Sequence, residues 1–332
     1  MQLSDAAQGR EAPINSRAVL ILMLWSAPRS RSTAFYRMMI ERGDFTGVHE
    51  PFSHVTAFGN TEISGRPLAT APEVIAELRS LAATRQVFIK DTTDRRHPEA
   101  LADRRFLAED AQHTFLIRHP RETIRSYLAV RTNPRIHEIG FEAQYEVYNK
   151  VRSLTGRDPL VVDAGDLMNR PADTMHAYCA HIGIDFRPHA LRWQPSDRPE
   201  WQGGFSHWFT DVAASSGLAE VPSRRSLVAE QHPLLGTYLE YHLPFYQELY
   251  QQRLVLKPHL ATWLVVANWP CPSPPCWRAD SYCHRDQTNP AGWLYGAGAD
   301  RGARHDAGRL VRATVAEWSR RIASHDDPRR RA

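Results

Sequence analysis

Lysine is nearly absent from this chain of 332 residues. Only three of its 41 basic residues are lysines, so arginine carries almost all of the positive charge, and the formal net charge is +4. Arginine binds planar and tetrahedral oxyanions better than lysine does, because its guanidinium presents a rigid fork of donors. An arginine bias also arises from a GC-rich coding sequence, so composition alone is weak evidence for anion binding. Against this bias, Lys90 stands out.

Long apolar runs are absent as well. No segment approaches the roughly 18 consecutive apolar residues of a membrane-spanning helix, so we expect no membrane partner. The apolar stretch 18–25, behind Arg10 and Arg17, has the length of a signal-peptide core, but an arginine-rich loop follows it. We therefore expect a cytoplasmic protein without a membrane partner, and we also expect no nucleic-acid partner.

Cysteine is scarce, with four in the whole chain. Three of them lie near the C-terminus, where Cys271, Cys276, Cys283 and His284 lack the paired C-x-x-C spacing of a zinc knuckle. We therefore predict no metal site. The stretch 258–332 that contains them is not patterned for a hydrophobic core, which predicts a tail of low order.

Glycine is missing from residues 11–42, which excludes a Walker A loop, because that loop requires the pattern G-x-x-x-x-G-K-[S/T]. This stretch instead contains an apolar run over 18–25, a break at Pro28, and a helical pattern over 32–42. A strand, a turn and a helix N-terminus make an anion site, because the first backbone N–H groups of the helix lack partners. The turn is therefore predicted to bind phosphate or sulfate. Its guanidinium and hydroxyl groups come from Arg29, Ser30, Arg31, Ser32 and Thr33.

A second strand, turn and helix follow over 114–128. Arg118 ends the apolar strand, Pro120 suits the first helical position, and Ser126 lies about two turns into the helix. Arg118 and Ser126 can therefore reach one anion in the crevice at the carboxyl ends of the strands. Two such units in one chain are far more specific than either alone.

Apolar strands alternate with amphipathic helices along the chain, which predicts βαβ crossovers and a mostly parallel sheet. Thr70 and Glu73 form a capping box, and Gly183 is placed to end another helix. We therefore expect a three-layer α/β/α sandwich. The predicted strands are 18–25, 46–49, 86–90, 113–117 and 159–163, and the predicted helices are 32–42, 72–84, 120–131, 138–154, 171–182 and 233–254. The expected domains are a polar segment over 1–17, one folded domain over 18–257 and the tail over 258–332.

The two units resemble the motifs of sulfotransferases that use 3′-phosphoadenosine 5′-phosphosulfate (PAPS). In that family a Pro-[Lys/Arg]-Ser-Gly-[Ser/Thr]-Thr loop wraps the 5′-phosphosulfate, and an Arg with a Ser eight residues later belongs to the 3′-phosphate motif. Arg118 and Ser126 match the second motif, and the resemblance covers roughly 18–255. It implies a P-loop-nucleotide-hydrolase-like fold and transfer of the PAPS sulfonate to a hydroxyl of a small-molecule acceptor. The matching loop residues are Pro28, Arg29, Ser30, Arg31, Ser32 and Thr33.

Parts of the chain depart from the family pattern. Arg31 replaces the usual glycine, so we expect a loop that does not need positive φ at this position. Arg29 takes the place of the basic residue beside the bridging oxygen on which charge develops, which makes it a catalytic candidate. The late basic loop that closes the donor site in many members is not recognisable. In the matching region 197–209, Trp201 is a candidate for stacking on adenine and Arg198 for reaching a phosphate.

The acceptor hydroxyl needs a general base, and Glu50 is our first candidate. It follows the second predicted strand as part of a Glu-Pro pair, where several bacterial and carbohydrate-directed family members have their proposed base. His49 and His54 are the alternatives, since small-molecule sulfotransferases use a histidine. That histidine normally follows the third strand, where this chain has Lys90 and Asp91. These two residues are candidates for contacting the sulfonate or the acceptor, or for an ordinary ion pair.

Two other functions stay open. An ATP-dependent P-loop phosphotransferase would need the Gly-Lys loop and a Walker-type carboxylate after an apolar strand, and the sequence has neither. A non-catalytic nucleotide-binding protein would not need the intact loop, Arg118, Ser126 and a candidate base together. The acceptor class also stays open among alcohols, sugars, phenols and antibiotic scaffolds, because acceptor pockets are built from variable loops.

Overall fold

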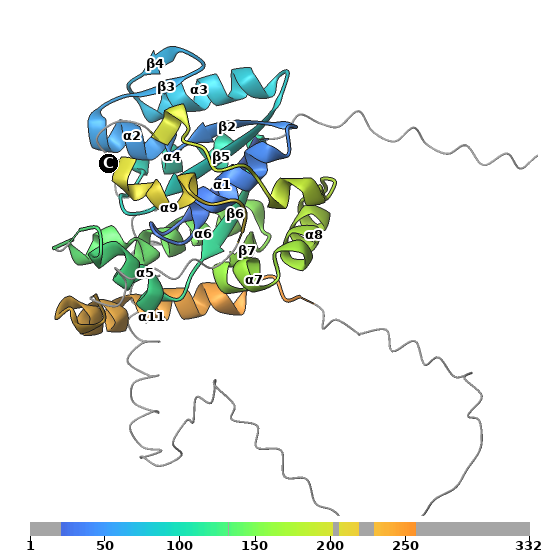
Figure 1. Ribbon diagram of the computed structural model, residues 1–332. Helices are drawn as coiled ribbons and strands as arrows, with labels where there is room; N and C mark the ends of the chain where they lie inside the picture. The colour runs from blue at the N-terminus through green and yellow to red at the C-terminus, as the bar shows by residue number, and fades with distance from the viewer. Residues whose placement is uncertain (1–20, 132, 202–205, 219–228, 257–332) are drawn as a thin grey trace, which may run out of the picture. The chain divides into compact units, whose positions relative to one another are not determined.

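The computed structural model describes residues 21–131, 133–201, 206–218 and 229–256 (Figure 1). In these residues a five-stranded sheet has the order β2-β5-β1-β6-β7, and all neighbouring strands are parallel. The chain leaves β1 for the edge strand β2, returns through β5, and then crosses β1 to reach β6. Such a change of direction creates a crevice at the carboxyl ends of the strands. The strands are β1 (Ile21–Ser26), β2 (Phe45–His49), β5 (Gln86–Thr92), β6 (Ala111–Ile117) and β7 (Leu160–Asp163).

Helices connect these strands, and their ends follow the capping signals of the sequence. Before the third helix, Thr70 accepts a hydrogen bond from the backbone of Glu73 at 3.3 Å, and the Glu73 carboxylate accepts one from the backbone of Thr70 at 3.0 Å. Gly183, with φ of 77°, ends another helix as predicted. The helices are α1 (Ser32–Glu41), α2 (Pro51–Phe58), α3 (Ala71–Ala82), α4 (Pro98–Ala102), α5 (Pro120–Leu128), α6 (Phe141–Thr155), α7 (Ala164–Asn169), α8 (Pro171–Ile182), α9 (Thr210–Ala213) and α11 (Leu234–Gln251).

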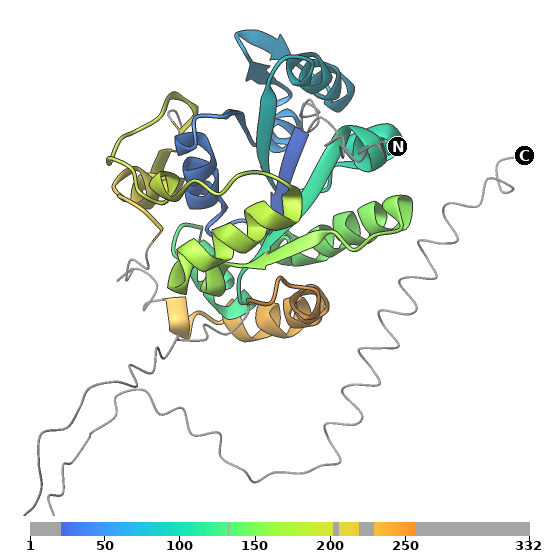
Figure 2. The ribbon, with the colours of Figure 1, turned by 90° about the vertical axis from the view of Figure 1, so that its right-hand side faces the viewer.

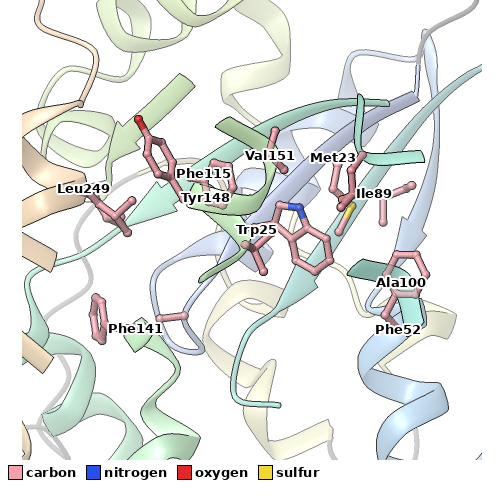
Figure 3. Close-up of a cluster of buried hydrophobic side chains, with 14 of the residues drawn as sticks. Met23, Trp25, Phe52, Ile89, Ala100, Phe115, Phe141, Tyr148, Val151 and Leu249 are labelled. Carbon is pink, nitrogen blue, oxygen red and sulfur yellow. The ribbon is translucent and has the colours of Figure 1, made fainter. Parts of the chain in front are cut away.

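The alternation of side chains along β1 divides the core into two layers. Because successive residues of a strand point to opposite faces, Met23 and Trp25 belong to one buried cluster and Leu22 and Leu24 to the other. The first cluster is completed by α3, α6 and α11, and the second by α1 and α8 (Figure 2). Figure 3 shows the fully buried Trp25 in the middle of the first cluster. The expected three-layer sandwich and its five parallel strands are therefore confirmed.

The start of α6 differs from the prediction. A helix was expected from residue 138, but the chain makes a 3-10 turn over Ile136–Ile139, and α6 begins only at Phe141. Gly140 between them has φ of 90° and lies so close to Pro28 and Thr93 that an added Cβ would be 3.0 Å from each. A left-handed glycine wedged under the first turn therefore breaks the helical pattern. Similarly, α5 ends at residue 128 rather than 131.

The segment between β2 and α3 received no prediction. It forms α2 and a short antiparallel hairpin of β3 (Thr61–Ile63) and β4 (Arg66–Leu68). These elements are too short to show a clear periodicity, and tertiary contacts hold them. The predicted segments 1–17 and 258–332, including the cysteines of the tail, lie outside the described residues. None of the helices in the described part of the chain combines the length and hydrophobicity that a membrane span needs.

Candidate active site

The turn between β1 and α1 has an unusual backbone. Arg29 and Arg31 both adopt left-handed conformations, with φ of 64° and 69°, and Arg31 directly precedes α1. We expected a turn without positive φ at Arg31, and this expectation is wrong. The turn keeps a geometry that glycine adopts freely, although an arginine occupies the position. A left-handed L-residue costs roughly 1–2 kcal/mol, and strain of this kind clusters at functional sites.

The second motif meets this turn because β6 lies next to β1 in the sheet. The Nε of Arg29 donates to the Oγ of Ser126 at 3.0 Å, and the guanidinium of Arg118 donates to the backbone carbonyl of Arg29 at 3.1 Å. Arg118 also pairs with Glu122, four residues later in the first turn of α5, at 2.9 Å. Two motifs that are far apart in the sequence are therefore brought together, as the shared strand edge predicts.

The segment around α9 contacts Arg29 as well. The Arg29 guanidinium donates to the backbone carbonyl of Trp208 at 2.8 Å, lies 5.6 Å from the centre of the Trp208 ring, and is 4.0 Å from the Asp211 carboxylate. Burial lowers the pKa of Arg29, Asp211 opposes this effect, and the nearby charges of Arg118 and Arg31 lower the pKa further. Like charges gathered around a buried guanidinium favour an anionic ligand that neutralises them.

Glu50 lies directly after β2, in a third left-handed conformation with φ of 50°. The sheet register places His49 opposite Lys90, and the backbone N–H of Glu50 donates to the Lys90 carbonyl at 2.7 Å. The Lys90 ammonium also donates to the Glu50 carboxylate, and the two side chains are 2% and 16% exposed. Burial, the largest single effect, raises the pKa of the Glu50 carboxyl, but Lys90, with smaller contributions from His49 and His54, lowers the pKa to about 2. Glu50 is therefore ionised and paired.

The alternative bases, His49 and His54, have different surroundings. The His49 side chain is 1% exposed, and its ring nitrogens make no hydrogen bond within the described part of the chain. Its ring packs edge-on against Tyr36 and Phe209. Burial lowers the pKa of His49 to about 3, so its ring is neutral. His54 is only partly buried and lines the cavity described below.

His49, Glu50 and His54 also offer three potential metal-ligating atoms within 4.8 Å of one another. However, the ammonium of Lys90 already occupies the cation position beside Glu50. A divalent ion at this carboxylate would have to displace Lys90 or bear its repulsion. The arrangement therefore disfavours a metal ion at Glu50.

Arg29, Glu50 and Lys90 line one cavity of about 1310 Å³, whereas the buried His49 does not. Typical small-molecule sites measure roughly 300–1,000 Å³, so this cavity has room for a nucleotide and a second molecule. The turn after β1 and helix α5 line one part of it, and Glu50, Lys90 and α2 line another. The predicted site residues that line the cavity are Pro28, Arg29, Arg31, Ser32, Thr33, Glu50, His54, Lys90, Arg118 and Ser126.

A model of the family described as sulfotransferase domain matches residues 20–252. The chain belongs to the sulfotransferase domain family. Two plant relatives from Arabidopsis thaliana are named branched-chain-amino-acid aminotransferase-like proteins 1 and 2. The first is 25% identical over 267 residues, which cover 76% of this chain and 44% of that protein. The second is 24% identical over 242 residues, which cover 69% and 41%. The chain thus spans less than half the length of these relatives.

Solved sulfotransferase structures also resemble this chain. The sulfotransferase domain from the curacin biosynthetic pathway is 16% identical, with a TM-score of 0.41 over 64% of this chain and 97% of that one. The sulfotransferase from Alicyclobacillus acidocaldarius is 12% identical, with a TM-score of 0.42 over 70% of this chain and 96% of that one.

Some residues predicted for the sulfotransferase site do not reach the cavity. Ser30 is fully buried beneath the turn surface and is not among the lining residues. Asp91 is also fully buried, and it accepts hydrogen bonds from the backbone of Phe52 at 2.8 Å and of Ser53 at 3.3 Å, so it holds the start of α2. Burial raises the pKa of Asp91. Because Lys90 and Asp91 are successive residues of β5, they point to opposite faces.

The two residues suggested for the adenine side are engaged elsewhere. Trp201 is 1% exposed and stacks on Phe209, with ring centres 6.1 Å apart. Arg198 donates to the Glu200 carboxylate at 2.6 Å. Neither residue lines the cavity, so the geometry does not support their expected contacts with the donor. Trp208, from the same segment, does line it.

Sequence analysis also missed several lining residues. Arg125 lies three residues after the cavity-lining Glu122 on α5 and therefore on the same face of the helix, so its place in the cavity had a signal in the helical periodicity of the sequence. Phe58 and Asp94 had none, because they belong to α2 and to the turn after β5, whose conformations depend on tertiary contacts.

Proposed function

We propose that this protein is a PAPS-dependent sulfotransferase that moves the sulfonate of PAPS to a hydroxyl of a small-molecule acceptor. The observation that carries the proposal is the convergence of the two anion-binding motifs, with Arg29 and Ser126 3.0 Å apart, in a cavity that Glu50 also lines. A donor-binding turn and a candidate base thus face one space, as a reaction between two substrates requires. PAPS enters as a co-substrate and leaves as 3′-phosphoadenosine 5′-phosphate (PAP).

In this proposal the turn after β1 binds the 5′-phosphosulfate. The backbone N–H groups at the start of α1 lack helical partners, and the hydroxyls of Ser32 and Thr33 add further donors. Arg118 and Ser126 bind the 3′-phosphate. Charge-assisted hydrogen bonds to phosphate are the strong ones, so Arg118 carries more of this affinity than Ser126.

The chemistry is an in-line transfer of the sulfonate. The acceptor oxygen forms a bond to sulfur, the bond from sulfur to the 5′-phosphate oxygen breaks, and that oxygen keeps the electron pair. Arg29 neutralises the charge that develops there, which is the main contribution a protein makes to such transfers. Glu50 takes the proton of the acceptor hydroxyl. Lys90, which lies on the neighbouring strand β5, contacts the sulfonate.

The acceptor occupies the part of the cavity nearest Glu50. Phe58 at the end of α2, His54 on the same helix and Thr61 at the start of the hairpin line this part. Apolar and hydroxyl groups together suit a molecule that presents a hydroxyl on a partly apolar frame. Since these elements are short, they are the places where acceptor preference is set.

A nucleotide comparison tests the proposal. We expect PAP to raise the melting temperature more than ATP, ADP or adenosine 5′-phosphosulfate do at equal concentration, because only PAP carries the 3′-phosphate. Arg118→Ala should remove this preference. Arg152→Ala is the matched control, since Arg152 pairs with Asp158 and does not line the cavity.

The outcome separates the competing functions. Stronger stabilisation by ATP would instead support a phosphotransferase. Tight PAP binding without release of PAP from PAPS, tested on a panel of phenols, sugars and alcohols, would indicate a protein that binds the nucleotide without catalysis.

A further inference from the structure

The ion pair between Lys90 and Glu50 conflicts with the role that we propose for Glu50. The positive charge of a bound ammonium group stabilises the ionised carboxylate, which is therefore a poor acceptor for the proton of a hydroxyl group. The pair is largely sheltered from water, with side-chain exposures of 2% for Lys90 and 16% for Glu50. A sheltered pair of opposite charges does not come apart unless another partner replaces one of them.

We propose that the donor sulfonate replaces Glu50 as the partner of Lys90, so that Glu50 becomes an effective base only when PAPS is bound. The inference rests on the proposed function. The ammonium leaves the carboxylate and binds the sulfonate oxygens. Glu50 then faces the acceptor hydroxyl without a counter-charge.

The geometry makes Lys90 suited to such an exchange. Lysine is a compact charge on a flexible four-carbon stem, and both Lys90 and Glu50 line the cavity that also contains Arg29. The ammonium therefore contacts the Glu50 carboxylate at the wall of the cavity in which we place the donor. Among the described residues, its only ion-pair partner is Glu50. A sulfonate next to the turn after β1 supplies the second anion that a sheltered ammonium requires before it moves.

Glu50 is held in place while Lys90 moves. Its backbone N–H donates to the Lys90 carbonyl at 2.7 Å, so the main chains of β2 and β5 stay joined whichever way the lysine side chain points. Glu50 also keeps a left-handed backbone, with φ of 50°, directly before the rigid Pro51. The backbone of Glu50 therefore stays in place when the ammonium moves.

The groups that remain around Glu50 make it more basic once Lys90 has left. His49 on β2 is neutral because burial lowers its pKa to about 3. His54 on α2 acts in the opposite direction, because it lowers the pKa of Glu50. Asp91 and Asp94, from β5 and the turn after it, carry like charge that acts on Glu50. Burial and like charges both favour the protonated carboxyl, so the pKa of Glu50 rises.

Proton uptake on donor binding is the measurable sign of this exchange. Calorimetry of PAPS binding without acceptor, in two buffers of different ionisation enthalpy at pH 6.5, gives the number of protons taken up. We expect wild type to take up about half a proton more than Glu50→Gln, if the Glu50 pKa rises to the 6–7 range typical of carboxylate bases. Comparing the two proteins cancels the ionisation of the ligand itself.

Two further measurements isolate the sulfonate and the lysine. With PAP, which lacks the sulfonate, wild type and Glu50→Gln should take up equal numbers of protons. Lys90→Met has no ammonium to exchange, so with PAPS it should show no extra uptake compared with Glu50→Gln. Equal uptake by wild type and Glu50→Gln with PAPS would overturn the exchange while leaving the proposed function intact. Failure of wild type to bind PAPS would remove the proposed function and this inference with it.

Discussion

Replacing Arg31 with glycine perturbs the strained turn in a way that separates its stability from its function. Arg31 has φ of 69°, a conformation that costs an L-residue roughly 1–2 kcal/mol and glycine almost nothing. Glycine also gains freedom in the unfolded chain, which costs about 0.5–1 kcal/mol. The Arg31 guanidinium makes no hydrogen bond or ion pair with the described residues, so no further contact is lost.

The balance predicts a net gain in stability of about 0.5–1 kcal/mol, which raises the melting temperature of a domain of this size by about 1–4 °C. Donor binding should change in the opposite direction. Arg31 lines the cavity, and the loss of a charge-assisted contact to the phosphosulfate costs about 1.5–3 kcal/mol. The Kd for PAPS should therefore rise by about one to two orders of magnitude.

Arg31→Ala is the matched control, because it removes the same charge and keeps the left-handed strain. We expect alanine to weaken PAPS binding as much as glycine does, without the gain in melting temperature. Calorimetry and thermal unfolding of the three proteins measure both effects. Equal melting temperatures for the glycine and alanine variants would refute the strain argument, and unchanged Kd values in both would show that the Arg31 side chain does not bind the donor.

Three further predictions concern the rest of the site and the core. Calorimetry of PAP should show a loss of about 1.5–3 kcal/mol for Arg118→Ala and about 1 kcal/mol for Ser126→Ala, because only the first removes a charged contact; equal losses would contradict these roles. Glu50→Gln should lower turnover by roughly 10²–10⁴-fold and leave PAP affinity near wild type; if His54→Ala loses turnover instead, histidine is the base. Burial lowers the pKa of His113 to about 4, so the folded state resists its protonation. The neutral His113 ring should therefore contribute fully to the free energy of unfolding above pH 6.5, and this contribution should decrease toward pH 4 by up to about 3 kcal/mol. In denaturation curves, His113→Gln should weaken this decrease.

The parallel sheet could be predicted because its strands are buried on both faces and therefore stand out as short apolar runs. The five runs beginning near residues 18, 46, 86, 113 and 159 all became strands of the sheet. The order of the strands also places both turns that we predict to bind anions at one edge, so the meeting of Arg29 with Ser126 could be expected from the pattern alone.

The sequence pattern was insufficient where a local conformation depends on a distant partner. Helix α2 begins where the buried carboxylate of Asp91 binds two of its backbone N–H groups, and no pattern in residues 51–58 announces this contact. The two tryptophans near residue 200 show the same limit. Trp201 packs into the core and Trp208 faces the cavity, and residue type alone does not distinguish them.

The strained residues identify the site by a physical argument that does not depend on family likeness. Of the four non-glycine residues with positive φ in the described part of the chain, Arg29, Arg31 and Glu50 line the cavity, and the fourth, Ser64, lies in the turn between β3 and β4. At roughly 1–2 kcal/mol each, the strain at the three cavity residues sums to roughly 3–6 kcal/mol, comparable with the lower end of the net stability of an ordinary domain, about 5–15 kcal/mol. Such strain persists only where the surrounding structure imposes it. Here the buried strand β1 and the backbone bond between Glu50 and Lys90 impose it. Glycine would relieve the strain at each of the three cavity positions, and the charged side chains that occupy them instead line the space where we place the sulfonate.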